Sequence, residues 1–122
     1  MDKIKIRPKV KTLPTSTNSN ETFQNEVLRP IIKLQHELIL TCFEHHINQK
    51  KITIESTANK ILIQNKLRAI IKKDNQLKAD LKNLIIGLFT IEEYKEYLLS
   101  KSEINKRTLQ IIEERIVSTL IK

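Results

Sequence analysis

Cysteine, glycine, proline and tryptophan are scarce in this sequence of 122 residues, which has one, one, three and none of them. The lone cysteine excludes a disulfide framework and a zinc site built from several cysteines, and it favours a reducing, cytoplasmic environment. A single glycine excludes a glycine-rich phosphate-binding loop, and so few turn residues are untypical of a β sandwich or barrel. Apolar runs reach only the six residues 84–89. We therefore expect neither a membrane span nor a secretory signal.

Hydrophobic residues make up 39% of the chain, which is enough for one buried core. The formal net charge of +8 is concentrated in two stretches. Residues 1–20 carry five cations and one anion, and residues 50–82 carry nine cations and three anions. Basic stretches of this kind attract nucleic acids and acidic protein surfaces, although a lysine-rich genome produces the same excess.

We expect a flexible basic arm over residues 1–20, because Pro8 and Pro14 interrupt its alternating pattern and a polar run follows. Residues 21–122 form a single all-α domain, a compact bundle of about five helices. The helices are predicted over residues 20–48, 56–72, 75–88, 91–99 and 101–121, with a loop over 49–54.

Capping patterns mark the predicted helix starts. Asn20 is the expected N-cap of the first helix, and Asp74 or Asn75 that of the third. The segments 90–93 and 100–103 both have the capping-box pattern, in which a hydroxyl and a glutamate three residues later bind each other's backbone amides.

Pro30 lies inside the first predicted helix, and we expect it to kink this long helix. The alternative is a break, in which Pro30 opens a second helix at its first turn. At 100° per residue, the apolar residues of this helix form two stripes that together cover about twice the arc of an ordinary surface helix. The main stripe is Phe23, Val27, Ile31, Leu34, Leu38 and Cys42, and the second is Leu28, Ile32, Ile39 and Phe43. We favour a central helix that the others cover. The alternative is that the second stripe is an interface with a protein partner or a second copy.

The remaining helices have one apolar stripe each. The residues predicted to face the core are Leu62, Ile63, Leu67, Ile70 and Ile71, then Leu77, Leu81, Leu84 and Leu88, then Ile91, Tyr94 and Leu98, and finally Leu109, Ile112, Ile116 and Leu120. Gly87 falls near the end of the third helix, which is typical of a close approach between helices.

Cys42, His45 and His46 share one side of the first helix and raise the hypothesis of a metal site. Zinc needs three or four ligands, and the sequence offers no second cluster of cysteine or histidine. We therefore expect no metal or other cofactor. Cys42 should pack as a small hydrophobe with a raised pKa, which is the opposite of a reactive thiolate.

Lys72, Lys73 and Asn75 stand at the predicted start of the third helix, where free amides and two ammonium groups would favour an anion. The competing interpretation, which we favour, is that Asp74 caps this helix itself.

From about residue 21 onward, the chain resembles a family of small, helical bacterial proteins without an established function. The resemblance lies in FQNEVLRP at 23–30, KDN at 73–75 and GLFT at 87–90 followed by Glu93 and Tyr94. Some members carry a glyoxalase label, but a glyoxalase I domain is built from βαβββ units with histidine, glutamine and glutamate ligands. The chain offers no such pattern beyond its arm, so the resemblance implies a helical domain and no catalytic residue.

These observations favour a small cytoplasmic module, not an enzyme, that acts through a protein partner or self-association. The alternative is a nucleic-acid-associated protein that uses the arm and residues 50–82. Four of the five aromatic residues stand at core-like positions, so no stacking platform for bases is predicted. A glyoxalase-type metalloenzyme is the third hypothesis.

Overall fold

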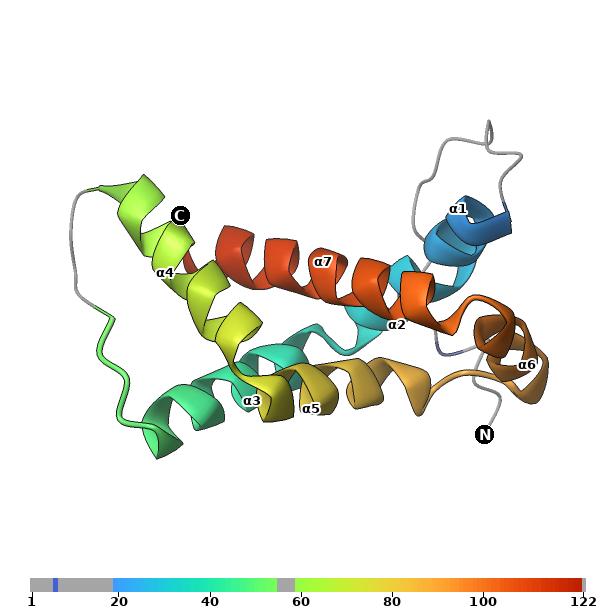
Figure 1. Ribbon diagram of the computed structural model, residues 1–122, viewed down its shortest axis with the longest axis horizontal. Helices are drawn as coiled ribbons and strands as arrows, with labels where there is room; N and C mark the ends of the chain where they lie inside the picture. The colour runs from blue at the N-terminus through green and yellow to red at the C-terminus, as the bar shows by residue number, and fades with distance from the viewer. Residues whose placement is uncertain (1–5, 7–18, 55–58, 122) are drawn as a thin grey trace.

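The computed structural model describes Ile6, residues 19–54 and residues 59–121, and these residues form an all-α fold (Figure 1). No strand occurs among them, so this part of the chain contains no glyoxalase-type βαβββ unit. The elements are α1 (Ser19–Phe23), a π-helical turn η1 (Gln24–Leu28), α2 (Arg29–Leu34), α3 (His36–Gln49), α4 (Lys60–Lys73), α5 (Asn75–Ile86), α6 (Ile91–Leu99) and α7 (Lys101–Leu120).

The long helix α7 runs the length of the molecule, with α3 and α5 side by side beneath it (Figure 1). Helix α4 crosses at one end, while α6 at the other end returns the chain from α5 to α7. The core lies between η1, α2, α3, α4, α5 and α7. Its fully buried aliphatic and aromatic side chains are Leu28, Ile31, Ile32, Ile39, Phe43, Leu67, Ile71, Leu77, Leu81, Ile85, Ile112 and Ile116.

The predicted arm falls mostly outside the described residues. Within it, Ile6 lies in a turn and is exposed. Helix α1 already includes Ser19 and Asn20, so the prediction of Asn20 as an N-cap is wrong.

Capping explains where the later helices begin. Asp74 accepts a hydrogen bond from the amide of Leu77 (3.0 Å), and Thr90 and Glu93 form both bonds of the predicted capping box. The second predicted box fails, because Ser100 makes no side-chain capping bond and its own amide donates to the Tyr97 carbonyl of the preceding helix.

The second predicted helix begins later than expected. Asn59 has an extended backbone and accepts from the amides of Ile61 and Leu62, so α4 starts at residue 60 and not at 56. Upstream of it, Lys51 adopts a left-handed conformation with φ 53°. This conformation ends α3 in a Schellman motif, because the amide of Ile52 then reaches the carbonyl of Ile47 (3.0 Å).

Pro30 lies in the first turn of α2, and the backbone stays helical through Leu28 and Arg29, so the chain is not broken there. Proline has no amide proton, and in an α-helix its ring clashes with the carbonyl four residues earlier. The preceding π turn, in which the amide of Arg29 donates to the carbonyl of Gln24, provides a wider turn at this point. A second interruption occurs at Gln35, whose side-chain amide donates to the Leu84 carbonyl in α5 (3.0 Å).

Several side chains predicted to face the core are exposed instead. Leu38 is one, because the interruption at Gln35 shifts the phase of α3 away from the 100° period that would continue from the buried Ile31. On the later helices the exposed ones are Leu62, Ile91, Tyr94, Leu98 and Leu120. Gly87 ends α5 at the surface, so no close helix approach explains it.

Candidate functional site

The four residues predicted as a partner interface, Leu28, Ile32, Ile39 and Phe43, are all completely buried in the chain's own core. Helices α5 and α7 pack against the segment that carries them. These residues are therefore core residues and offer no free surface to a partner, as the favoured interpretation of a central helix predicts for the second stripe.

The predicted anion site at the start of α5 is occupied by the protein's own Asp74. One oxygen of Asp74 accepts from the Leu77 amide, and the other lies 3.2 Å from Nζ of Lys50 and 3.5 Å from Nδ1 of His46. The hydrogen bond from the Leu77 amide, followed by the bond and the charge of Lys50, holds the pKa of Asp74 below its ordinary value.

The neighbouring residues of that predicted site remain at the surface. Lys72, Lys73 and Asn75 are exposed, and with an anionic carboxylate between them they do not form an anion cradle. Lys73 also borders a cleft of about 300 Å³, whose lining residues are Lys50, Ile52, Lys66, Ala69, Ile70, Lys73 and Asp74.

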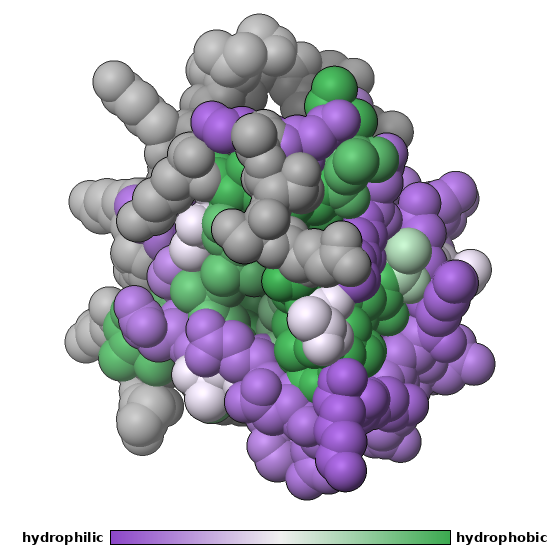
Figure 2. Space-filling model, turned by 90° about the vertical axis from the view of Figure 1, so that its left-hand side faces the viewer, coloured by the Kyte–Doolittle hydropathy of each residue, from purple (hydrophilic) through white to green (hydrophobic). Residues whose placement is uncertain are grey.

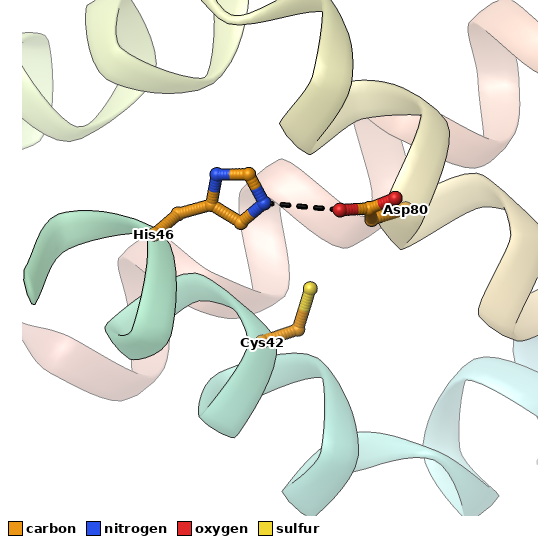
Figure 3. Close-up of side chains that lie close together, drawn as sticks. All are labelled: Cys42, His46 and Asp80. Carbon is orange, nitrogen blue, oxygen red and sulfur yellow. Dashed lines mark hydrogen bonds and ion pairs between the residues drawn. The ribbon is translucent and has the colours of Figure 1, made fainter. Parts of the chain in front are cut away.

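Cys42 and His46, which the sequence places one turn apart on α3, meet Asp80 of α5 (Figure 3). Nε2 of His46 lies 3.0 Å from Oδ2 of Asp80, and the sulfur of Cys42 points toward the gap between them. Sγ of Cys42, one ring nitrogen of His46 and one carboxylate oxygen of Asp80 all lie within 4.8 Å of one another. A thiol, an imidazole and a carboxylate therefore converge at one place between two helices.

The charges of this cluster affect its titration. Desolvation, followed by the negative charge of Asp80, raises the pKa of the Cys42 thiol above its ordinary value, as the sequence predicts for a half-buried cysteine. Hydrogen bonds from His46 and then from Gln76 lower the pKa of Asp80. The thiol is therefore protonated and the carboxylate ionised at neutral pH.

The other two histidines lie apart from the cluster. His45 is exposed, and its Nε2 lies 3.4 Å from the side-chain amide of Gln49 on the same helix. Nδ1 of His36 lies 3.2 Å from the guanidinium of Arg115 in α7. Of the predicted trio, only Cys42 and His46 come together, and the third member is Asp80, which the sequence analysis missed. The available signal was the position of Asp80 beside Leu81, on the border of the apolar stripe of α5.

A second feature that sequence reasoning missed is the outer side of α6. Its large apolar residues Ile91, Tyr94, Leu98 and Leu99 are 73%, 42%, 50% and 85% exposed, and we call them the α6 surface. Only Tyr97 turns inward, where its ring packs on Phe89 (centroids 5.6 Å apart) and its hydroxyl donates to Asn105 (2.6 Å). The side chain of Tyr97 thus anchors α6, and the side chains of the α6 surface face outward.

Another exposed apolar pair, Ile61 and Leu62, lies in the first turn of α4. Figure 2 views the molecule from this end and shows apolar surface bordered by hydrophilic residues. Residues 55–58, which precede α4, lie outside the described part of the chain. We therefore treat this pair as a control surface and not as a candidate site.

Comparisons with protein-family models, with curated proteins and with solved structures find no match to this chain. The family resemblance thus stays a prediction. Among the residues that the structure describes, no helix combines the length and the apolar character needed to cross a lipid bilayer.

Proposed function

We propose that the protein is a helical binding module that engages a protein partner through the α6 surface. The observation that carries this proposal is the orientation of α6, a nine-residue helix with four large apolar side chains in solvent. Burying an isoleucine or leucine side chain contributes about 1.5–3 kcal/mol, so a surface of this kind favours a partner that covers it.

The spacing of the α6 surface suits recognition of a helix in a groove. Ile91, Tyr94 and Leu98 stand at positions i, i+3 and i+7, which place three anchors on one face. The helix is held in advance by its capping box and by Tyr97, so little ordering entropy opposes binding. Glu92, Lys95 and Glu96 are exposed beside these anchors. A complementary partner therefore has an apolar groove with charged side chains of both signs on its border.

The test compares two double variants in affinity capture from cell lysate. Ile91→Ser with Leu98→Ser removes anchors of the α6 surface, and Ile61→Ser with Leu62→Ser removes equally exposed apolar side chains on α4. A partner bound at α6 is captured by the wild type and by the α4 variant. The α6 variant loses about 2 kcal/mol of binding or more, which lowers the amount captured roughly 30-fold. Unchanged melting curves show that both variants are folded.

Three outcomes contradict this proposal. Equal capture by all three proteins places the partner elsewhere on the chain. Equal loss in both double variants points to non-specific hydrophobic association. Light scattering that shows a dimer of the wild type and a monomer of the α6 variant identifies the occupant as a second copy, in place of a different protein.

The alternative as a nucleic-acid-associated protein is favoured by one observation, the basic cleft beside α4. Lys50, Lys66 and Lys73 line it, and all three are exposed. Phosphate contacts made there give salt-dependent binding of RNA or DNA without sequence preference. Lys66→Gln with Lys73→Gln then lowers the salt dependence of binding, whereas Lys101→Gln with Lys106→Gln on α7 leaves it unchanged. Gel shifts that do not occur at low salt, or that both double variants reduce equally, exclude this alternative.

A further inference from the structure

The cluster of Cys42, His46 and Asp80 contains the donor types that zinc prefers. Zinc is bound by cysteine sulfur at about 2.3 Å and by histidine nitrogen and carboxylate oxygen at about 2.0–2.2 Å, commonly in a tetrahedron. The structure brings one of each to a single gap between α3 and α5, with Cys42 and His46 one turn apart on the same helix. We propose that these three residues bind a zinc-like divalent metal ion, with the fourth position left to water.

The distances fit such a site after a small movement. In a tetrahedron with these bond lengths, two ligand atoms lie about 3.3–3.6 Å apart. Nε2 of His46 and Oδ2 of Asp80 are already 3.0 Å apart. All three ligand atoms lie within 4.8 Å, so the sulfur of Cys42 has to approach by no more than about 1.2 Å, which a side-chain rotation supplies.

An ion pair between α3 and α5 explains His46 and Asp80, while Cys42 packs against the core beside them and its thiol takes no part in the pair. Sγ of Cys42 makes no hydrogen bond within the described part of the chain, and yet it faces the same gap. The cluster is also accessible from solvent, because the side chain of Asp80 is 41% exposed while that of His46 is 12% exposed. An ion can reach the carboxylate from solvent and complete its coordination at the more buried imidazole and thiol.

The surroundings orient the proposed ligands. Oδ2 of Asp74 lies 3.5 Å from Nδ1 of His46, on the side of the ring away from Asp80. Metal-binding histidines commonly have a carboxylate at the other ring nitrogen, which fixes the ring and directs the free nitrogen to the metal. On the opposite side, the amide of Gln76 donates to Oδ1 of Asp80 (2.8 Å), which leaves Oδ2 for the metal. The site uses α3 and α5 only, so it is independent of the α6 surface.

Cobalt(II) replaces zinc as a spectroscopic probe, and the test is a titration of the full-length protein with Co²⁺ at neutral pH. We expect visible bands of a four-coordinate ion and a near-ultraviolet charge-transfer band from the thiolate. Zn²⁺ added afterwards displaces both. The matched control is His45→Ala, because His45 adjoins His46 and meets its ring edge-on (centroids 6.3 Å apart) but supplies no ligand atom to the cluster. This variant keeps the wild-type spectrum and affinity, whereas His46→Ala loses binding.

Two further variants separate binding from folding. Cys42→Ala removes a partly buried sulfur at the edge of the core, and it abolishes the charge-transfer band while its circular dichroism stays that of the wild type. Asp74→Asn keeps a good helix cap but loses the charge beside His46, and it lowers the affinity by about 10–100-fold. The proposal is overturned by a spectrum without a thiolate band, by equal loss of binding in His45→Ala and His46→Ala, or by calorimetry that detects no binding of either metal.

Discussion

Leu38 and Phe43 provide the sharpest test of the fold, because they lie five residues apart on α3 in opposite environments. Phe43 is completely buried between α3 and its neighbours, whereas Leu38 is 47% exposed. The sequence assigns Leu38 to the main stripe and Phe43 to a second stripe that a partner could have covered. Truncation of each side chain to alanine measures how much that side chain contributes to the free energy of unfolding of the monomer.

The expected magnitudes differ several-fold. Phe43→Ala removes a ring from the core and leaves a cavity, which costs about 3–5 kcal/mol. Leu38→Ala gives up about half of the roughly 1.5–3 kcal/mol that full burial of a leucine contributes, so we expect a loss of at most about 1.5 kcal/mol. In a domain of this size each kcal/mol shifts the melting temperature by about 4–8 °C. Phe43→Ala should therefore melt about 12–40 °C lower than the wild type, and Leu38→Ala at most about 12 °C lower.

Urea unfolding followed by far-ultraviolet circular dichroism measures both free energies on the same scale. Equal destabilisation by the two substitutions would refute the arrangement of α3, because it requires Leu38 to be covered as well. A loss below about 1 kcal/mol for Phe43→Ala would show that the second stripe lies outside the core. If the loss for Leu38→Ala depends on protein concentration, a second copy covers this face.

Other predictions concern single contacts. Lys51→Gly should stabilise the protein by about 0.5–1 kcal/mol in urea unfolding, because glycine adopts the left-handed conformation without strain; a loss of stability would contradict this assignment. Thr90→Ala should cost about 1 kcal/mol through its capping box, whereas Ser100→Ala, which loses no capping bond, should cost less than half of that. Burial raises the pKa of Tyr97, so its contribution to stability is complete below pH 10 and is lost as pH rises through the folded-state pKa. Tyr97→Phe should cost about 1 kcal/mol at neutral pH, through the bond to Asn105, and should lose less stability above pH 10 than the wild type; parallel pH profiles would contradict this.

Local signals were sufficient for most helix boundaries. The cap at Asp74 and the box at residues 90–93 depend on groups within three residues of each other, so the sequence contains the whole interaction. The second box at residues 100–103 shows the limit of this reasoning. Its pattern is equally good, but a single residue separates α6 from α7, and the amide of Ser100 is already used by the preceding helix.

Which face of a helix turns inward could not be predicted from its period alone. An apolar stripe on α6 indicates an amphipathic helix, but the choice between Tyr97 and the opposite side depends on Phe89 and Asn105, which belong to other segments. The phase error at Leu38 has a different cause. A wheel drawn at 100° per residue assumes an unbroken α-helix, and the interruption at Gln35, between the buried Ile31 and the exposed Leu38, violates this assumption.

Asp74 makes one contact that the sequence predicts, its cap on α5, and one that the sequence does not predict, the contact with His46. Its cap on the Leu77 amide is a local contact, and this contact fixes the carboxylate at the start of α5. The second oxygen then lies beside His46, which in turn points its Nε2 at Asp80, a residue 34 positions away along the chain. Helix capping thus holds the imidazole in a binding orientation before any ion arrives. Little reorganisation is left for binding beyond the approach of the thiol and the loss of protons, and for this reason the test on Cys42 carries the most weight.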